Sequence, residues 1–306
     1  ESTTSPFSVT WTAGKEGLYR LTAVVTDEVS GVGTSPTVQV TVGTPPPQAL
    51  YVAAAGGPNG SDNAIVARLQ SQGWQVRVVG DTPSQTSDAN GMNLIIVSST
   101  VGSGNVGGKF TAAPVPLINW EEALQDNLLL TTDEANVTRA STAGQDAITI
   151  VKADHPLAAG LGAGAKTIVT SAQSFSWGVP AASATLVAAM ADDPTHGAIY
   201  AYDTGATLID GVTKAPARRV HFLLTNDAFP NLNADGVKLF DAAVKWAANL
   251  PERVAAPTLN LARTATGITL TFTGTLQSAD AVTGPWADVA NAKSPFPAAV
   301  AGGAKF

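Results

Sequence analysis

The sequence contains no cysteine, few charged residues and only three histidines. Without cysteine the chain can form no disulfide and offers no thiolate nucleophile, iron–sulfur ligand or cysteine-type zinc site. Charged residues make up 13% of the chain, well below the typical ~25% of globular proteins. We therefore expect a surface covered by Ser, Thr, Asn, Gln, Gly and Ala, which suits a protein that works outside the cell.

The charges that are present are mainly acidic, with a net charge of −7. Because the sequence has no basic stripe, we expect neither nucleic acid nor an anionic membrane surface as a partner. No apolar run reaches the roughly 20 residues that span a bilayer, so we expect no membrane span. The 306 residues, 44% of them hydrophobic, suffice for two or three packed domains. A start at Glu1 rather than Met predicts a removed leader or a longer parent chain.

Residues 1–43 show the apolar–polar alternation of β-strands. Strands are expected at Phe7–Trp11, Leu18–Thr26 and Val38–Val42, with a turn at Asp27–Gly33. The runs Trp11–Gly14 and Gly17–Ala23 resemble the last strands of bacterial Ig-like repeats. A complete sandwich of that kind needs about 100 residues and seven strands, so we expect a sheet edge left open here.

A Pro-rich linker at residues 44–48 leads to residues 49–250, where apolar runs alternate with helical stripes. Strands are expected at Ala49–Ala55, Val76–Val79, Leu94–Val97 and Val115–Ile118, with further candidates at Ala147–Val151, Thr185–Ala189, Ala198–Tyr202 and Val220–Leu224. One helix should begin at Ser61 and end at Gly73, and another should be capped by Asn233. This alternation predicts an α/β domain with a parallel sheet.

A second linker at residues 251–257 precedes a small β module at residues 258–306. Leu259–Leu261 and Ile268–Phe272 predict a hairpin, which Leu276–Asp280 and Gly284–Val289 complete. The last two motifs resemble the short C-terminal β modules of exported proteins from the Verrucomicrobia and Planctomycetes group.

The central region resembles bacterial extracellular modules related to the ThuA-like and class I glutamine-amidotransferase-like families. The residues that carry this resemblance are Ser98–Val101, Pro116–Glu121, Asp154–Leu161, Ala215–Val220 and Ala242–Ala247. The resemblance implies a flavodoxin-like sheet. It does not imply amidotransferase chemistry, because the nucleophile of that family is a cysteine and this chain has none.

Ligands of open α/β sheets bind beyond the carboxyl ends of the strands. The polar residues expected at that edge are Asn59, Asp62, Asp81, Ser98, Ser99, Asn119 and Glu121, with His155 as a further candidate. The competing interpretation, which we favour for most of them, is that they cap helices and satisfy loop backbone. We assign no catalytic residue, cofactor or metal to them.

Several chemical patterns lack the context that they require. Ser99, Glu121 and His155 follow the chain order of an α/β-hydrolase triad, but no Gly-x-Ser-x-Gly elbow surrounds the serine. Gly102–Gly107 matches G-x-G-x-x-G, but it follows the third strand and not the first, so we expect a flexible loop. The remaining candidates are possible metal ligands, but they show neither the ligand spacing of a zinc site nor that of an EF-hand calcium loop. They are His155, His196, His221, Asp192, Asp193 and Asp203.

These features predict a non-catalytic structural or adhesive subunit that is secreted or held at the cell surface. Unfinished sheets expose edge strands that pair with another chain. We therefore expect homo-oligomers or head-to-tail polymers in a filament or layer, with a polysaccharide or the cell envelope as a further partner. Two alternatives stay open. One is a carbohydrate-active enzyme or sugar-binding accessory module, with Glu121, Glu122 and Asp154 as available acids, and the other is a module that binds a small ligand without chemistry.

Overall fold

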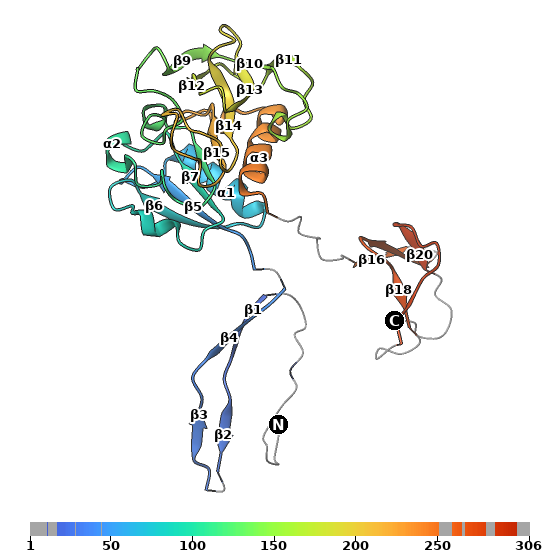
Figure 1. The fold of residues 1–306 in the computed structure, drawn as a ribbon. Helices are drawn as coiled ribbons and strands as arrows, with labels where there is room; N and C mark the ends of the chain where they lie inside the picture. Colours follow the sequence, from blue (N-terminus) through green and yellow to red (C-terminus); the bar gives the residue numbers. More distant parts are fainter. Residues whose placement is uncertain are drawn as a thin grey trace. The chain divides into compact units, whose positions relative to one another are not determined.

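A computed structural model describes residues 11, 17–27, 29–43, 45–250, 259–264, 267–279 and 285–298. The chain divides into two compact units, residues 1–250 and residues 251–306 (Figure 1). The predicted strand at residues 7–11, apart from Trp11, and the predicted linker at residues 251–257 lie outside the described residues.

The N-terminal segment is a two-stranded antiparallel ribbon, in which β1 pairs with β4 and β2 with β3. The four strands are β1 (Gly17–Leu21), β2 (Val24–Thr26), β3 (Val32–Thr34) and β4 (Val38–Val42). Asp27 closes the turn, because its carboxylate accepts hydrogen bonds from the N–H groups of Val29 and Gly31. No further strand joins the ribbon within the described residues, so the Ig-like assignment remains a prediction.

The central domain is built on an eleven-stranded mixed sheet. Five neighbouring strands run parallel in the order β6-β5-β7-β8-β15. Their bounds are β5 (Gln48–Ala53), β6 (Gln75–Gly80), β7 (Leu94–Val97), β8 (Leu117–Asn119) and β15 (Arg219–Phe222). Along the chain this order is 2-1-3-4-5, which is the flavodoxin-like order. The predicted α/β class and flavodoxin-like sheet are therefore present.

The rest of the sheet is antiparallel, so the prediction of a parallel sheet throughout the domain was wrong. Along the chain, six strands come after β8 and before β15. They are β9 (Arg139–Gln145), β10 (Ala147–Ile150), β11 (Gly164–Thr167), β12 (Gln173–Gly178), β13 (Thr185–Met190) and β14 (Gly197–Tyr202). β14 pairs antiparallel with β15, and β13, β10 and β11 continue the sheet. Most connections here are too short for the crossover of about a dozen residues that a parallel pair needs.

Three α-helices and four 3-10 helices occur in the described part of the chain. They are α1 (Gly60–Ser71), α2 (Ser103–Val106), α3 (Ala234–Ala248), η1 (Thr86–Ala89), η2 (Glu122–Leu124), η3 (Pro156–Ala158) and η4 (Phe229–Asn231). The cap of α1 is Asn59, not the predicted Ser61. The predicted cap of α3 is confirmed, because the Asn233 side chain accepts from the N–H groups of Asp235 and Gly236.

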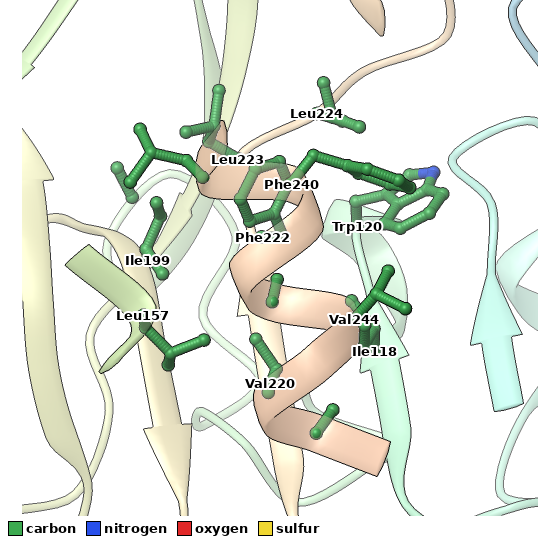
Figure 2. Packing of buried hydrophobic residues seen from close by; sticks show 14 of the residues in the cluster. Ile118, Trp120, Leu157, Ile199, Val220, Phe222, Leu223, Leu224, Phe240 and Val244 are labelled. Carbon is green, nitrogen blue, oxygen red and sulfur yellow. The ribbon is translucent and has the colours of Figure 1, made fainter. Parts of the chain in front are cut away.

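Helices and loops cover both faces of the sheet. On one face α1 and α3 pack over a core that includes Tyr51, Trp120 and Phe240. Figure 2 shows Phe240 and Val244 of α3 against the side chains of β8 and β15. The other face is covered mainly by side chains from residues 101–130. Because both faces are buried, the strands read as continuous apolar runs without alternation.

The C-terminal unit holds two small antiparallel sheets. One contains β16 (Leu259–Thr264), β17 (Gly267–Phe272) and β20 (Phe296–Ala298), and the other contains β18 (Gln277–Ser278) and β19 (Ala287–Asp288). The pairing of β16 with β17 confirms the predicted hairpin. Across the described residues of the whole chain, no helix has the length and apolar character to cross a membrane.

Candidate functional site

An open pocket of about 590 Å³ lies at the carboxyl edge of the parallel strands, where ligands of such sheets bind. Three of its walls are formed by the residues that follow β7, β8 and β15 in the sequence, and the remaining wall is formed by residues of β9 and β12. The lining residues are Ser99, Trp120, Glu121, Glu122, Ser141, Ala143, Gly144, Ala172, Gln173, Ser174, Thr225, Asn226 and Asp227. Of the eight predicted site residues, only Ser99 and Glu121 line this pocket.

Asp62 is held inside the fold and does not line this pocket, so its place in a ligand site stays a prediction. Its carboxylate is 1% exposed and accepts hydrogen bonds from the hydroxyls of Tyr51 (2.7 Å), Ser98 (2.6 Å) and Thr100 (3.0 Å). It also accepts from the N–H of Asn59, which completes the capping box of α1. These partners satisfy the Asp62 carboxylate and the Ser98 hydroxyl within the fold.

Asn59 supports the pocket from outside its lining. Its amide nitrogen donates to the backbone carbonyl of Asn226 at 3.2 Å. Since Asn226 lines the pocket, Asn59 fixes one pocket loop to the start of α1.

Asp81 occupies the position that a phosphate would need beside Gly102–Gly107. Its carboxylate accepts from the Gly102 N–H at 2.7 Å and from the Asn105 amide at 3.1 Å. Despite burial, these and the Thr82 hydrogen bonds lower the pKa of Asp81. The segment forms the single-turn helix α2 and not the flexible loop expected, and its N-terminal end is already bound to an anion of the protein itself.

Glu121 and Asn119 form the turn that follows β8. The Asn119 amide donates to the Glu121 carbonyl at 2.8 Å, and the Glu121 N–H donates to the Asn119 amide oxygen at 3.2 Å. The Glu121 carboxylate accepts only from the Ala123 N–H among the hydrogen bonds of the described residues. Burial raises the pKa of Glu121 to about 7; the Ala123 hydrogen bond lowers it, and the nearby Glu122 carboxylate raises it.

Arg139 of β9 neutralises the acidic groups beside the pocket. Its guanidinium, with a side chain only 10% exposed, contacts Glu122 at 2.8 Å, Asp133 at 2.8 Å and Asp126 at 3.2 Å. These three carboxylates take its close contacts. Glu121 receives no hydrogen bond from Arg139, and burial raises the pKa of Glu121 more than the charge of Arg139 lowers it.

The structure does not assemble the hydrolase triad. His155 caps η3, its Nδ1 accepting from the Leu157 N–H at 3.2 Å, and its ring lies 5.2 Å from the Trp246 ring. It does not line the pocket that holds Ser99 and Glu121, so its role as a site residue stays a prediction. The Ser99 hydroxyl is buried without a hydrogen-bond partner in the described part of the chain, so no base activates it.

Among the described residues, no group of three His, Asp or Glu side chains is arranged so that it could hold a metal ion. His196 stacks on Trp177 at 3.5 Å, and His221 stacks on Tyr200 at 5.0 Å. Asp203 is paired with Arg218 at 2.9 Å. Each of these side chains therefore has a local partner of its own.

Sequence reasoning missed the wall formed by Ser141, Gln173, Ser174 and Asp227. Ser141 and Gln173 belong to β9 and β12, which pair with each other, and no local signal places them opposite the carboxyl edge of β8. The one available signal was the hydroxyl-rich and amide-rich run of residues 170–174.

No family model and no curated protein matches the chain. Several solved structures are similar over 66% of it. They include a GMP synthase subunit from Thermoplasma acidophilum (12% identity, 94% of that chain, TM-score 0.39) and PurLQS from Thermotoga maritima (13%, 99%, 0.40). A glutamine amidotransferase from Thermotoga maritima is a third (6%, 83%, 0.36). TM-scores this low carry no argument, and the fold assignment rests on the strand order.

Proposed function

We propose that this protein is a non-catalytic, extracellular structural or adhesive subunit whose copies join through the β segments at the two ends of the chain. The observation that carries the proposal is the N-terminal ribbon. In the described residues the ribbon is two strands wide along its length, and its aliphatic side chains are largely exposed. An isolated two-stranded ribbon is marginally stable in water, so a further strand or sheet is expected to complete it.

The exposed side chains of the ribbon lie on both of its faces. Val25 is 67% exposed, Val32 is 68% exposed and Val38 is 59% exposed. Val25 pairs with Gly33, whereas Val32 pairs with Thr26 on the opposite face of the ribbon. Both faces therefore present apolar surface, and within the described residues each strand of the ribbon pairs with one other strand.

The C-terminal unit presents a similar surface. β16 is an edge strand that pairs only with β17 in the described residues. Its Leu259 and Leu261 are 62% and 64% exposed, and they lie opposite Phe272 and Leu270. Directly opposed residues share a face of the sheet, so this apolar face continues to an open edge.

The two ends of the chain carry different β structures, and we expect each to pair with a strand of another copy. Contacts between copies would then run head to tail. Edge-to-edge pairing gives affinity through main-chain hydrogen bonds, and alternate side chains give specificity. Contacts between different surfaces of successive copies build an open filament when the rotation does not close. The low charge of the chain, 13%, limits repulsion between copies and supports an assembling surface protein.

A non-catalytic role is supported by the absence of an activated nucleophile. The sequence has no cysteine, and Ser99 has no histidine beside it in the described pocket lining. Of the acids considered for glycoside hydrolysis, Glu122 is held by Arg139 and Asp154 does not line the pocket.

The test is to place lysines on the exposed ribbon positions, as in the double variant V25K/V38K. Lysine on an edge strand blocks pairing with another chain, so we expect filaments in electron micrographs of the full chain and monomers for this variant. The matched control is V212K, since Val212 is 80% exposed on the central domain, and it should assemble as the parent does. A parent chain that is monomeric at every concentration, or a V25K/V38K variant that still polymerises, would contradict the proposal.

A further inference from the structure

The pocket at the carboxyl edge of the sheet is a cavity with fixed walls, and the proposed assembly through the ends of the chain does not use it. Its walls are fixed by hydrogen bonds between distant segments, including Thr225 Oγ1 to the Ser174 carbonyl at 2.6 Å and Asn59 to the Asn226 carbonyl at 3.2 Å. Its volume of about 590 Å³ falls in the range of small-molecule sites. These features point to a ligand.

The charges of the lining exclude one ligand class. No lysine, arginine or histidine stands among the lining residues, all of which are described. Arg139 lies beside the pocket but is committed to Glu122, Asp126 and Asp133. A phosphate, a sulfate or a carboxylate would thus meet carboxyl groups without a free cation, which is unfavourable.

The polar groups of the lining favour another ligand class. The hydroxyls of Ser141 and Ser174 and the side-chain amide of Asn226 offer donors and acceptors from several walls. The Thr225 hydroxyl and the Gln173 amide nitrogen already donate within the protein, so these two side chains offer their oxygens as acceptors. Trp120 is only 1% exposed, so it offers no face on which a flat apolar ring could stack. A neutral molecule with many hydroxyl groups matches this lining.

We propose that the pocket binds a neutral polyhydroxylated small molecule, and that Glu121 enters the site as an uncharged carboxylic acid that donates a hydrogen bond to a ligand oxygen. The geometry supports this state of Glu121, because its carboxyl lies in the pocket with one hydrogen-bond donor, the Ala123 N–H, in the described residues. An unpaired carboxylate would be costly in such surroundings, whereas the protonated acid can hydrogen-bond to a hydroxyl.

The charged groups that surround Glu121 act in both directions. Its own turn contributes the Glu122 carboxylate, which favours the protonated acid, and the loop after β15 contributes the further acid Asp227. Arg139 of β9 has the opposite effect, although its close contacts are with other carboxylates. β12 and the loop after β7 contribute neutral groups only, namely Gln173, Ser174 and Ser99. Behind the lining, burial lowers the pKa of His221 to about 4, so this ring is uncharged at neutral pH.

The direction of the expected pH dependence follows from the raised pKa of Glu121, about 7. Below this pH the acid is protonated and the binding form predominates. If only the protonated form binds, the apparent affinity falls with the protonated fraction, by about 30-fold between pH 6 and pH 8.5. Glu121→Gln keeps a neutral donor of similar size, so it should bind equally at both pH values.

The experiment is calorimetric or NMR titration of the full chain with neutral probes: glucose, galactose, mannose, N-acetylglucosamine and inositol. Glucose 6-phosphate and glucosamine serve as the anionic and cationic counterparts. We expect at least one neutral probe to bind at pH 6 and to weaken about 30-fold by pH 8.5, while glucose 6-phosphate does not bind. The E121Q variant should lose this pH dependence, and Gln173→Ala should weaken binding at every pH.

The control for these variants is Asp192→Asn, a change at an exposed acid that does not line the pocket, and it should behave as the parent chain does. No binding of any neutral probe, or stronger binding of glucose 6-phosphate or glucosamine, would refute the ligand class. A pH dependence that persists in E121Q would refute the role of Glu121, even if a neutral ligand binds.

Discussion

Gly178 shows how closely side chains are packed in the sheet behind the pocket. An added Cβ would lie 2.7 Å from the Tyr200 hydroxyl and would overlap the Gln125 side chain that accepts its hydrogen bond. We therefore predict that Gly178→Ala lowers the free energy of unfolding by about 1–3 kcal/mol, as overpacked cores do. Gly104→Ala, where a Cβ meets nothing within 4 Å, should change it by less than ~0.5 kcal/mol. Equal urea midpoints for the two variants would contradict this packing.

At the scale of single residues, the sequence predicted some residues of the pocket lining and missed others, for a physical reason. Ser99 and Glu121 were found because a polar residue directly after a buried strand lies at the carboxyl edge. Asp62 and His155 lie outside the pocket lining, and each caps a helix instead, because a polar residue near a turn can equally satisfy the backbone. Gln173 was missed because its place depends on the pairing of β12 with β9.

At the scale of elements, the first turn of α1 is a junction between the helix and the sheet. Asp62 in that turn binds three hydroxyls from β5 and from the segment after β7. Asp62→Ala would leave these hydroxyls buried without an acceptor, at a cost of at least about 3 kcal/mol of unfolding free energy. Asp235→Ala, in the first turn of α3 with a side chain 39% exposed, should cost less than about 1 kcal/mol. Denaturant unfolding compares the two, and similar losses would show that Asp62 is not such a junction.

Element positions were more predictable than element pairing. The strands Leu94–Val97 and Ala198–Tyr202 were both visible as apolar runs, and the structure places β7 and β14 there. Burial on both faces produces such a run in parallel and antiparallel neighbours alike. The apolar pattern therefore could not reveal that β14 runs antiparallel to β15, nor that β10–β11 and β13–β14 are antiparallel hairpins.

At the scale of the whole molecule, the chain combines a well-packed central domain with two ends whose apolar β surfaces are open. The central domain buries a continuous core on each face of its sheet. The ribbon and β16 instead expose aliphatic side chains such as Val25, Val38 and Leu261. On the proposal that only the ends pair with another copy, we expect unfolding of the central domain to be independent of assembly, and assembly to depend on the ends alone.

The most direct test of head-to-tail joining is a mixing experiment with two shortened chains, residues 1–250 and residues 44–306. Each retains the central domain but only one of the two ends. Sedimentation velocity should show monomers for each alone and a complex of one copy of each in the mixture, because the ribbon of the first then meets the C-terminal sheet of the second. Two species that sediment independently when mixed, at concentrations where the full chain assembles, would contradict the account.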